Sequence, residues 1–222
     1  MGTDPLEALR GECELVSQTV LGLPEEDFAR ETRLPAWNVK ELFGHMYRDI
    51  NRINEALDRP GPPAADADSV SYWRRYDPSV DSPDIAKRAK EVAASYASGQ
   101  ELASAWNEMW RRTLGRAGTT EPDRVMVTWG PALTLDEYLR TRVLEIAVHR
   151  IDLNDALGLP PDPTEGGLEI TTEILLRLLE PPSSEIPLEG VDLLEAGTGR
   201  RSLTDDERKA LGHLADKFPL IS

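Results

Sequence analysis

Three residues of this sequence have the types and spacing of a metal-binding set. The chain contains three histidines, His45, His149 and His213, and Glu145 lies four residues before His149. Residues four apart share one face of a helix, so Glu145 and His149 can act together. Two histidines with one carboxylate form a three-ligand set that leaves coordination positions open for water or substrate. Such ligands suit Zn²⁺ first, and also Ni²⁺, Fe²⁺ or Mn²⁺.

The helix that carries Glu145 and His149 is predicted to turn both side chains toward the protein interior. On a helical wheel of residues 135–156, one largely polar line contains Tyr138, Arg142, Glu145, His149, Asp152 and Ala156. Aliphatic residues flank this line on both sides, and the opposite side, expected to face solvent, carries Arg140, Arg150 and Asn154. Ionisable groups buried among aliphatic side chains must be paired, or must bind a metal or a ligand.

His45 is predicted to complete the set from another helix. The apolar stripe of residues 38–58 is formed by Val39, Leu42, Met46, Ile50, Ile53 and Leu57, and His45, Asp49 and Arg52 run beside it. A core histidine bonded to Asp49 or to a carbonyl is the ordinary alternative. The Glu145–His149 pair across the bundle favours a ligand role instead, because bundles build interior metal sites from facing helices. His213 is interpreted as a surface or packing residue.

Helix signals dominate the chain and predict an all-α fold. Capping boxes begin at Asn38, Thr134 and Thr204, where a polar cap precedes a glutamate by three residues. We expect helices over residues 4–23, 38–58, 82–114, 134–158 and 164–180, with a last short helix after Thr204. Residues 59–81 are rich in proline, aspartate and serine and are predicted to form a long loop, and a short extended piece is expected at 124–128. The expected architecture is a four-helix bundle with a C-terminal extension.

The composition restricts the possible partners. The 222 residues carry 25 basic and 40 acidic side chains, a net charge of −15 that disfavours binding to a nucleic-acid backbone. No apolar run is long enough to span a membrane and no secretory signal is visible, so the cytoplasm is the expected location. The single cysteine, Cys13, belongs to an apolar helical stripe and is predicted to be buried and inert. Thiol chemistry would therefore need a thiol from outside the protein.

Three segments together resemble the DinB-like superfamily: LPAWNVKELFGHMYRDI (34–50), TWGP (128–131) and RTRVLEIAVHRIDLNDALG (140–158). They are most similar to its mycothiol-dependent maleylpyruvate isomerase group, and the tail GTGRRSLTDDERKALGHLADKFPL resembles C-terminal segments of that group. The resemblance implies a DinB-like metal-binding bundle at 1–160, with a helical extension at 161–222 packed on it. It also implies that His45, Glu145 and His149 are the metal ligands and that mycothiol is the thiol cosubstrate.

The activity implied is the activation of a small thiol for attack on a small electrophile. An open Zn²⁺ site can bind a thiol and release its proton near neutral pH. If the adduct with the electrophile persists, the enzyme is an S-transferase; if the thiol is expelled again, it is a cis–trans isomerase. Further residues are candidates for supporting roles. Asp152 or Asp49 would orient a ligand histidine, and Arg142 or Arg52 would bind an anionic substrate group. Tyr138 and Trp129 would line the pocket.

Two other interpretations stay open on the sequence. One is a DinB-like stress protein that binds a metal or a small ligand without turnover. The other is a structural bundle whose inward polar line is only a salt-bridge network, with Arg142 on Glu145 and His149 on Asp152. The electrophile and the oligomeric state, monomer or homodimer, are not specified by any motif.

Overall fold

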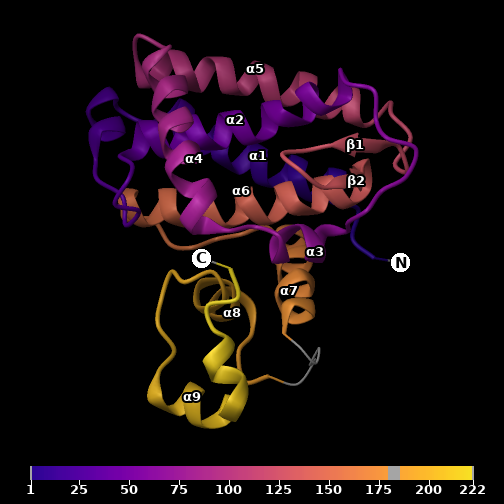
Figure 1. Cartoon of the computed structure of the whole chain (residues 1–222). Coiled ribbons are helices and arrows are strands. Elements are labelled where there is room, and N and C mark those ends of the chain that lie inside the picture. Colours follow the sequence, from indigo (N-terminus) through magenta and orange to yellow (C-terminus); the bar gives the residue numbers. More distant parts are fainter. Residues whose placement is uncertain (1, 180–185, 222) are drawn as a thin grey trace.

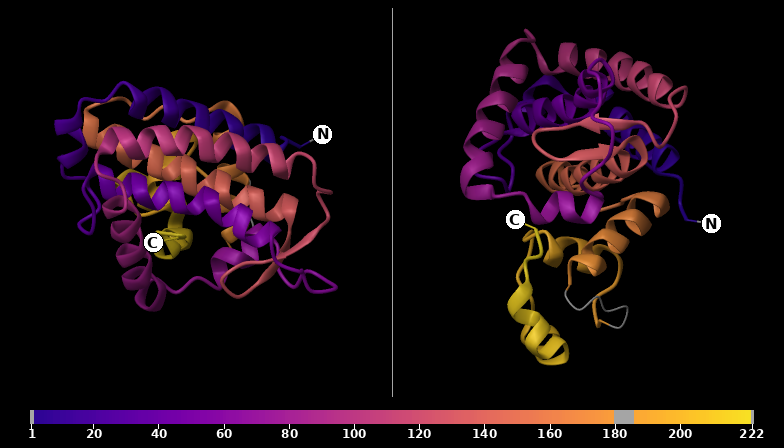
Figure 2. Two further views of the ribbon diagram at one scale, coloured as in Figure 1. Left: turned by 90° about the horizontal axis from the view of Figure 1, so that it is seen from above. Right: turned by 45° about the vertical axis from the view of Figure 1, so that its right-hand side comes forward.

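Four helices form the centre of the fold: α1 (Pro5–Leu21), α2 (Val39–Leu57), α5 (Gly99–Ala117) and α6 (Leu135–Leu157). The structure, a computed structural model, describes residues 2–179 and 186–221. Both α1 and α2 contact α5 and α6, so the four helices close into a bundle (Figure 1). Figure 2 shows these long helices running alongside one another. The prediction of an all-α fold is confirmed.

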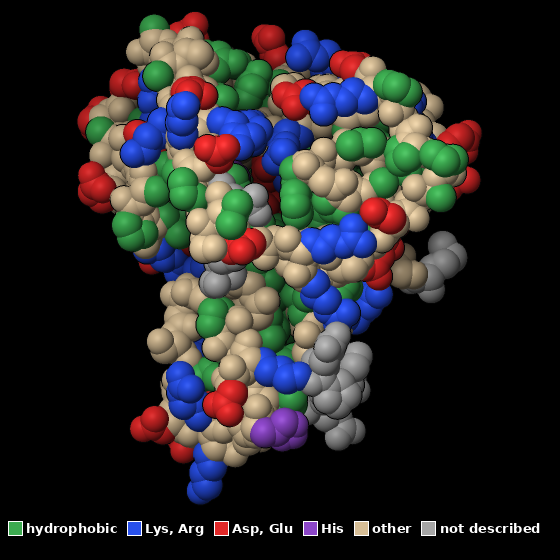
Figure 3. All heavy atoms as spheres, viewed as in Figure 1, with side chains coloured by type: hydrophobic (Ala, Val, Ile, Leu, Met, Phe, Trp, Pro, Cys, Tyr) green, Lys and Arg blue, Asp and Glu red, His purple; other side chains and the backbone are tan. Residues whose placement is uncertain are grey.

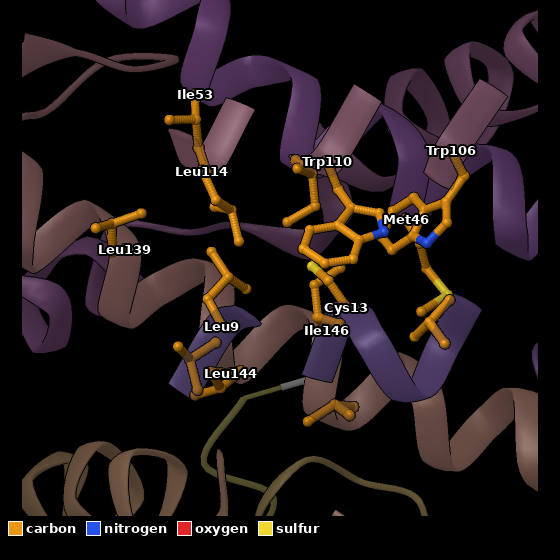
Figure 4. Close-up of a cluster of buried hydrophobic side chains, with 14 of the residues drawn as sticks. Leu9, Cys13, Met46, Ile53, Trp106, Trp110, Leu114, Leu139, Leu144 and Ile146 are labelled. Carbon is orange, nitrogen blue, oxygen red and sulfur yellow. The ribbon is translucent and has the colours of Figure 1, made fainter. Parts of the chain in front are cut away.

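The bundle core is apolar and contains the single cysteine. Figure 4 shows side chains from the four helices meeting in one cluster that includes Leu9, Cys13, Met46, Ile53, Trp106, Trp110, Leu114 and Ile146. Cys13 is fully buried, as predicted. Two indole nitrogens, those of Trp106 and Trp110, both donate hydrogen bonds to the Ser17 hydroxyl, at 3.0 and 2.8 Å. The cluster therefore buries its polar atoms with partners, as a stable core requires.

The predicted helix starts are confirmed at the residues that cap them. The Asn38 side chain accepts a hydrogen bond from the Glu41 backbone, and Glu41 returns one to the Asn38 backbone. The Thr134 hydroxyl accepts a hydrogen bond from the Glu137 backbone and begins α6, but the Glu137 side chain accepts from the Ser69 backbone instead, so the predicted capping box there is formed only in part. Helix α6 ends at Gly158, whose φ of 69° is left-handed. Glycine adopts that conformation without steric cost, which is why it ends helices so often.

The prediction of one long third helix over 82–114 is wrong, because this stretch is divided between two helices. Helix α4 (Pro78–Ala94) packs on α2 outside the bundle, and α5 lies within the bundle. The chain breaks at Ser98, whose side chain accepts a hydrogen bond from the Glu101 backbone and begins a new helix. The Gly99 backbone is tied to Glu25 in the short 3-10 helix η1 (Glu25–Ala29). These contacts redirect the chain, which the helical pattern alone does not reveal.

The prediction of an unbroken loop over 59–81 is also wrong. Helix α3 (Ser69–Arg74) begins with a capping box formed by Asp68 and Ser71, and α4 already starts at Pro78. The extended piece expected near 124–128 is confirmed as β1 (Val125–Val127), which pairs antiparallel with β2 (Ala132–Thr134). The turn between these strands is the TWGP segment, so Trp129 stands at the tip of a small hairpin.

The C-terminal part forms a lobe on the α6 side of the bundle (Figure 1). Helix α7 (Glu165–Leu178) packs on α1 and α6, and α8 (Gly190–Gly197) packs on α7. The lobe continues with α9 (Asp205–Leu211), which begins at the predicted Thr204 capping box, and a 3-10 helix η2 (Gly212–Lys217). Helix α8 was not predicted. The fifth helix was expected to run to residue 180, which lies outside the described residues, and α7 ends at Leu178. His213 is exposed, as predicted.

None of the helices in the described ranges combines the length and the apolar character needed to cross a lipid bilayer.

Candidate metal centre

The bundle brings His45 of α2 together with Glu145 and His149 of α6. One ligand atom of each side chain lies within 4.8 Å of the other two. The Glu145 Oε2 atom is 3.3 Å from His149 Nε2 and 3.6 Å from His45 Nε2. Donors bonded to one tetrahedral zinc ion lie roughly 3.3 Å apart, by the bond lengths usual for zinc. The donor set and its spacing therefore fit a divalent metal ion.

The electrostatics of the three side chains favour a positive charge between them. Burial opposes ionisation of Glu145, but hydrogen bonds from His149 and His45 and the charge of Arg142 hold its pKa well below the usual range. Burial also opposes the protonated form of His149, yet Asp152 and Glu145 raise the pKa of His149 to about 9. A group of this kind binds either a proton or a metal cation.

Asp152 fixes the orientation of His149. Its carboxylate accepts a hydrogen bond from His149 Nδ1 at 3.0 Å, which leaves Nε2 of the same ring facing Glu145. The guanidinium groups of Arg33 and Arg200 hold the other side of the carboxylate, at 2.7 and 2.9 Å. A carboxylate behind a ligand histidine is the usual support of a metal site. Neither arginine was identified from the sequence, because both come from segments without helical periodicity.

Asp49 and Arg142 form a buried ion pair next to the candidate metal centre. The Asp49 Oδ1 atom is 2.8 Å from Arg142 Nη1, and Arg142 also donates to the Tyr72 hydroxyl at 3.0 Å. The guanidinium lies over the Tyr138 ring, 5.1 Å from its centroid. The structure thus gives Arg142 a carboxylate partner of its own. Asp49 is 4.0 Å from His45 Nε2, which is too long for a hydrogen bond.

Trp37 covers the two histidines. Its ring stacks on His45 at 4.8 Å between centroids and meets the edge of His149 at 6.0 Å. Trp37 was not predicted as a site residue, although it lies in the same segment as His45, LPAWNVKELFGHMYRDI.

Two adjoining pockets reach the candidate metal centre, and both are lined by His45 and Glu145. The larger, a cleft of about 280 Å³, has mainly apolar walls that include Trp37, Leu144 and Val148, and it also reaches His149. The smaller pocket, of about 60 Å³, is lined by Arg48, Arg52, Arg88, Tyr72 and Trp129. The three arginines and Trp129 also line a wider depression of about 420 Å³, together with Tyr138. The candidate ligands therefore lie between a mainly apolar pocket and one lined by arginines.

The prediction that Arg140, Arg150 and Asn154 face solvent is wrong. All three are buried, with exposed fractions of 9%, 3% and 5%. Helices α1 and α7 cover this side of α6, so α6 is enclosed all round. Arg150 is neutralised by Glu12 of α1, at 2.8 Å. The helical wheel predicted the inward-facing line of α6 correctly. It did not predict that α1 and α7 cover the opposite side of the helix.

The pairs of a purely structural salt-bridge network are present only in part. His149 does contact Asp152, but the Arg142 guanidinium lies 3.9 Å from Glu145, a longer distance than that to Asp49. His45 Nδ1 is buried and has no hydrogen-bond partner among the described residues, so His45 lacks the support that Asp152 gives to His149.

The chain has relatives among curated proteins. It is 26% identical over 157 residues to uncharacterized proteins from two strains of Mycobacterium tuberculosis, and the match covers 68% of this chain and 55% of each relative. The chain therefore spans about half the length of these relatives. No solved structure matches it. The mycothiol maleylpyruvate isomerase N-terminal domain matches residues 9–154, a range that holds His45, Glu145 and His149, and the chain belongs to this family.

Proposed function

We propose that this protein binds Zn²⁺ through His45, Glu145 and His149 and uses it to activate mycothiol for attack on a small electrophile. The observation that carries the proposal is the convergence of the three ligand atoms beside two adjoining pockets, one mainly apolar and one lined by arginines. Membership of the family supports mycothiol as the thiol.

Zinc bound there would act as a Lewis acid that lowers the pKa of a bound thiol toward neutrality. The side chains around it have separate tasks. Asp152 keeps the proton of His149 on Nδ1, so that Nε2 is free to bind. Trp37 shields the two imidazoles from water. The protein's own thiol takes no part, because burial raises the pKa of Cys13 well above its ordinary value.

In the reaction the thiol loses its proton, and its sulfur adds to one carbon of a carbon–carbon double bond conjugated to an electron-withdrawing group, which takes up the electron pair of that bond. If the adduct then takes up a proton, the carbon–sulfur bond remains and the protein is an S-transferase. If the adduct rotates about the former double bond and expels the thiolate, the double bond forms again in the other geometry and the protein is an isomerase. Both outcomes use the same centre.

The metal part of the proposal is tested by metal content. We expect about one equivalent of zinc in the purified protein, as for a three-ligand site of this type. His45→Ala and Glu145→Gln should each lower the content severalfold. His213→Ala is the matched control, since His213 is exposed and distant from the centre, and it should retain the metal. An unchanged content in both ligand variants would contradict the assignment.

The thiol part is tested by incubating the zinc-loaded protein with mycothiol and a panel of electrophiles. Mass spectrometry should detect conjugates, or isomerised substrate, in amounts that depend on the metal and fall in the Glu145→Gln variant. Metal binding without any thiol-dependent product across the panel would overturn the catalytic proposal. That result would identify a binding protein without turnover.

A further inference from the structure

Three arginines gather beside the metal centre of a chain whose net charge is −15. Arg48 and Arg52 lie one turn apart on α2, and Arg88 lies on α4, which packs on α2. All three line both the small pocket that reaches His45 and Glu145 and the wider depression outside it. Figure 3 shows basic side chains around a hollow between α4 and the β1–β2 hairpin. We call Arg48, Arg52 and Arg88 the arginine cluster.

Two members of the arginine cluster, Arg48 and Arg52, have no carboxylate partner among the described residues. Arg48 and Arg52 make no ion pair or hydrogen bond with any described residue, and Arg88 pairs with Asp84 of its own helix, whose side chain is 74% exposed. The arginines around the rest of the site are neutralised, for example Arg142 by Asp49 and Arg200 by Asp152.

The acidic groups near the cluster do not cancel its charge. Asp49 and Glu145 line the small pocket, but they are occupied by Arg142 and by the two histidines. Glu55 lines the wider depression and is exposed to solvent. Burial, together with the charges of Arg52 and Arg88, lowers the pKa of Arg48 below its ordinary value. Half-buried like charges with too few counter-charges are stabilised by a bound anion.

We propose that the arginine cluster is an anion subsite that holds a carboxylate or phosphate group of the electrophile. This inference rests on the proposed function and assigns the chemical class of its second substrate. Guanidinium groups bind planar or tetrahedral oxyanions through two parallel hydrogen bonds, which fixes the orientation of the bound molecule. An electrophile anchored here extends toward His45 and Glu145 through the small pocket.

The walls of the subsite favour a flat organic anion. Tyr72, Trp73, Tyr76 and Trp129 line the small pocket beside the arginines. Trp129 lies 5.8 Å from Tyr72 between ring centroids and is 39% exposed at the hairpin tip. Aromatic faces next to guanidinium groups bind planar groups by stacking and leave the charged end to the arginines.

The test measures anion binding directly, by calorimetry on the full chain in buffer free of phosphate and sulfate. The probes are benzoate, phenyl phosphate and benzamide, which share a ring and differ in the charged group. We expect benzoate or phenyl phosphate to bind and benzamide to bind at least about tenfold more weakly, because it lacks the charge. The relative affinities of benzoate and phenyl phosphate show whether the subsite prefers a carboxylate or a phosphate. Equal affinity for benzamide would overturn the proposal.

Variants assign the binding to the cluster. Arg48→Gln and Arg52→Gln should each raise the dissociation constant of the bound anion by about tenfold, the effect of one charge-assisted contact. Arg112→Gln is the matched control, because Arg112 is exposed on α5 and its replacement changes the net charge by the same amount. It should change the constant less than about twofold. Thermal unfolding monitored by circular dichroism verifies that the variants are folded. Unchanged affinity in both folded cluster variants would contradict the subsite.

Metal-free protein separates this inference from the proposed function. The anion should bind with the same affinity to metal-free protein and to zinc-loaded protein, because the cluster contains no metal ligand. Loss of binding on removal of the metal would show that the anion is held by the metal, and would overturn the inference. Anion binding without any thiol-dependent reaction would contradict the proposed function alone.

Discussion

At the scale of single residues, the candidate centre depends on Asp152. This carboxylate is fully buried and contacts His149, Arg33 and Arg200 at once. Those contacts hold its pKa below the usual range, so it is ionised at every physiological pH. The sequence placed Asp152 on the inward line of its helix and suggested that it orients a ligand. Its two arginine partners come from loops, and no periodic pattern could have revealed them.

Replacing Asp152 by asparagine should weaken zinc binding by about 10- to 100-fold, the usual effect of removing the carboxylate behind a ligand histidine. The amide keeps the shape of the side chain but removes the charge that holds the proton on His149 Nδ1. Competition with a chromophoric chelator measures the change. Asp155→Asn, at an exposed residue in the last turn of α6, is the control and should leave zinc affinity within about twofold, because long-range charge effects are screened. Equal effects of both changes would argue against the role of Asp152.

At the scale of elements, capping residues proved more informative than periodicity. Asn38, Thr134 and Thr204 predicted the starts of α2, α6 and α9, because each satisfies backbone groups that the helix leaves free. The same pattern was present at Ser98 and Glu101, and it marks the break between α4 and α5. The break was not predicted, because the residues on both sides of Ser98 have the apolar spacing of a helix. The tertiary contact that makes the break necessary, Gly99 against Phe28, is not local in sequence.

Two glycines of α5 should respond oppositely to the same substitution. A Cβ atom at Gly99 would overlap the ring of Phe28, so Gly99→Ala should destabilise the fold by about 1–3 kcal/mol. A Cβ atom at Gly115 meets nothing within 4 Å, so Gly115→Ala should stabilise it by about 0.5–1 kcal/mol through the better helix propensity of alanine. Urea unfolding of the two variants measures both values. Destabilisation of equal size at both positions would show that crowding at Phe28 is not the cause.

At the scale of the whole molecule, Glu12 joins the bundle to the C-terminal lobe. It is fully buried on α1, pairs with Arg150 of α6, and accepts hydrogen bonds from the backbone and hydroxyl of Thr164, both at 2.7 Å. Thr164 is the residue that caps α7. One carboxylate therefore fixes three helices. Arg150 was predicted to face solvent, because the periodicity of one helix does not reveal an ion pair with a residue as distant in the chain as Glu12.

Loss of the Glu12 charge should destabilise the whole molecule. Glu12→Gln leaves the Arg150 guanidinium buried without a counter-charge, and removing one partner of such a pair costs about 3–5 kcal/mol. Glu14→Gln, also on α1, disturbs only the exposed contact with Arg111 and should cost less than about 1 kcal/mol. Chemical denaturation of both variants checks the difference. A small effect at Glu12 would mean that water or movement of α7 compensates the lost charge.

The contact between Arg200 and Asp152 has a consequence for the order of events during synthesis. The residues of the four bundle helices leave the ribosome before Arg200, which follows α8 in the chain. His45, Glu145 and His149 can therefore meet while the carboxylate behind His149 still lacks one of its two guanidinium partners. The centre reaches its final rigidity only when the lobe has folded against it. Metal capture by a nascent chain would thus be looser, and more easily reversed, than metal capture by the finished protein.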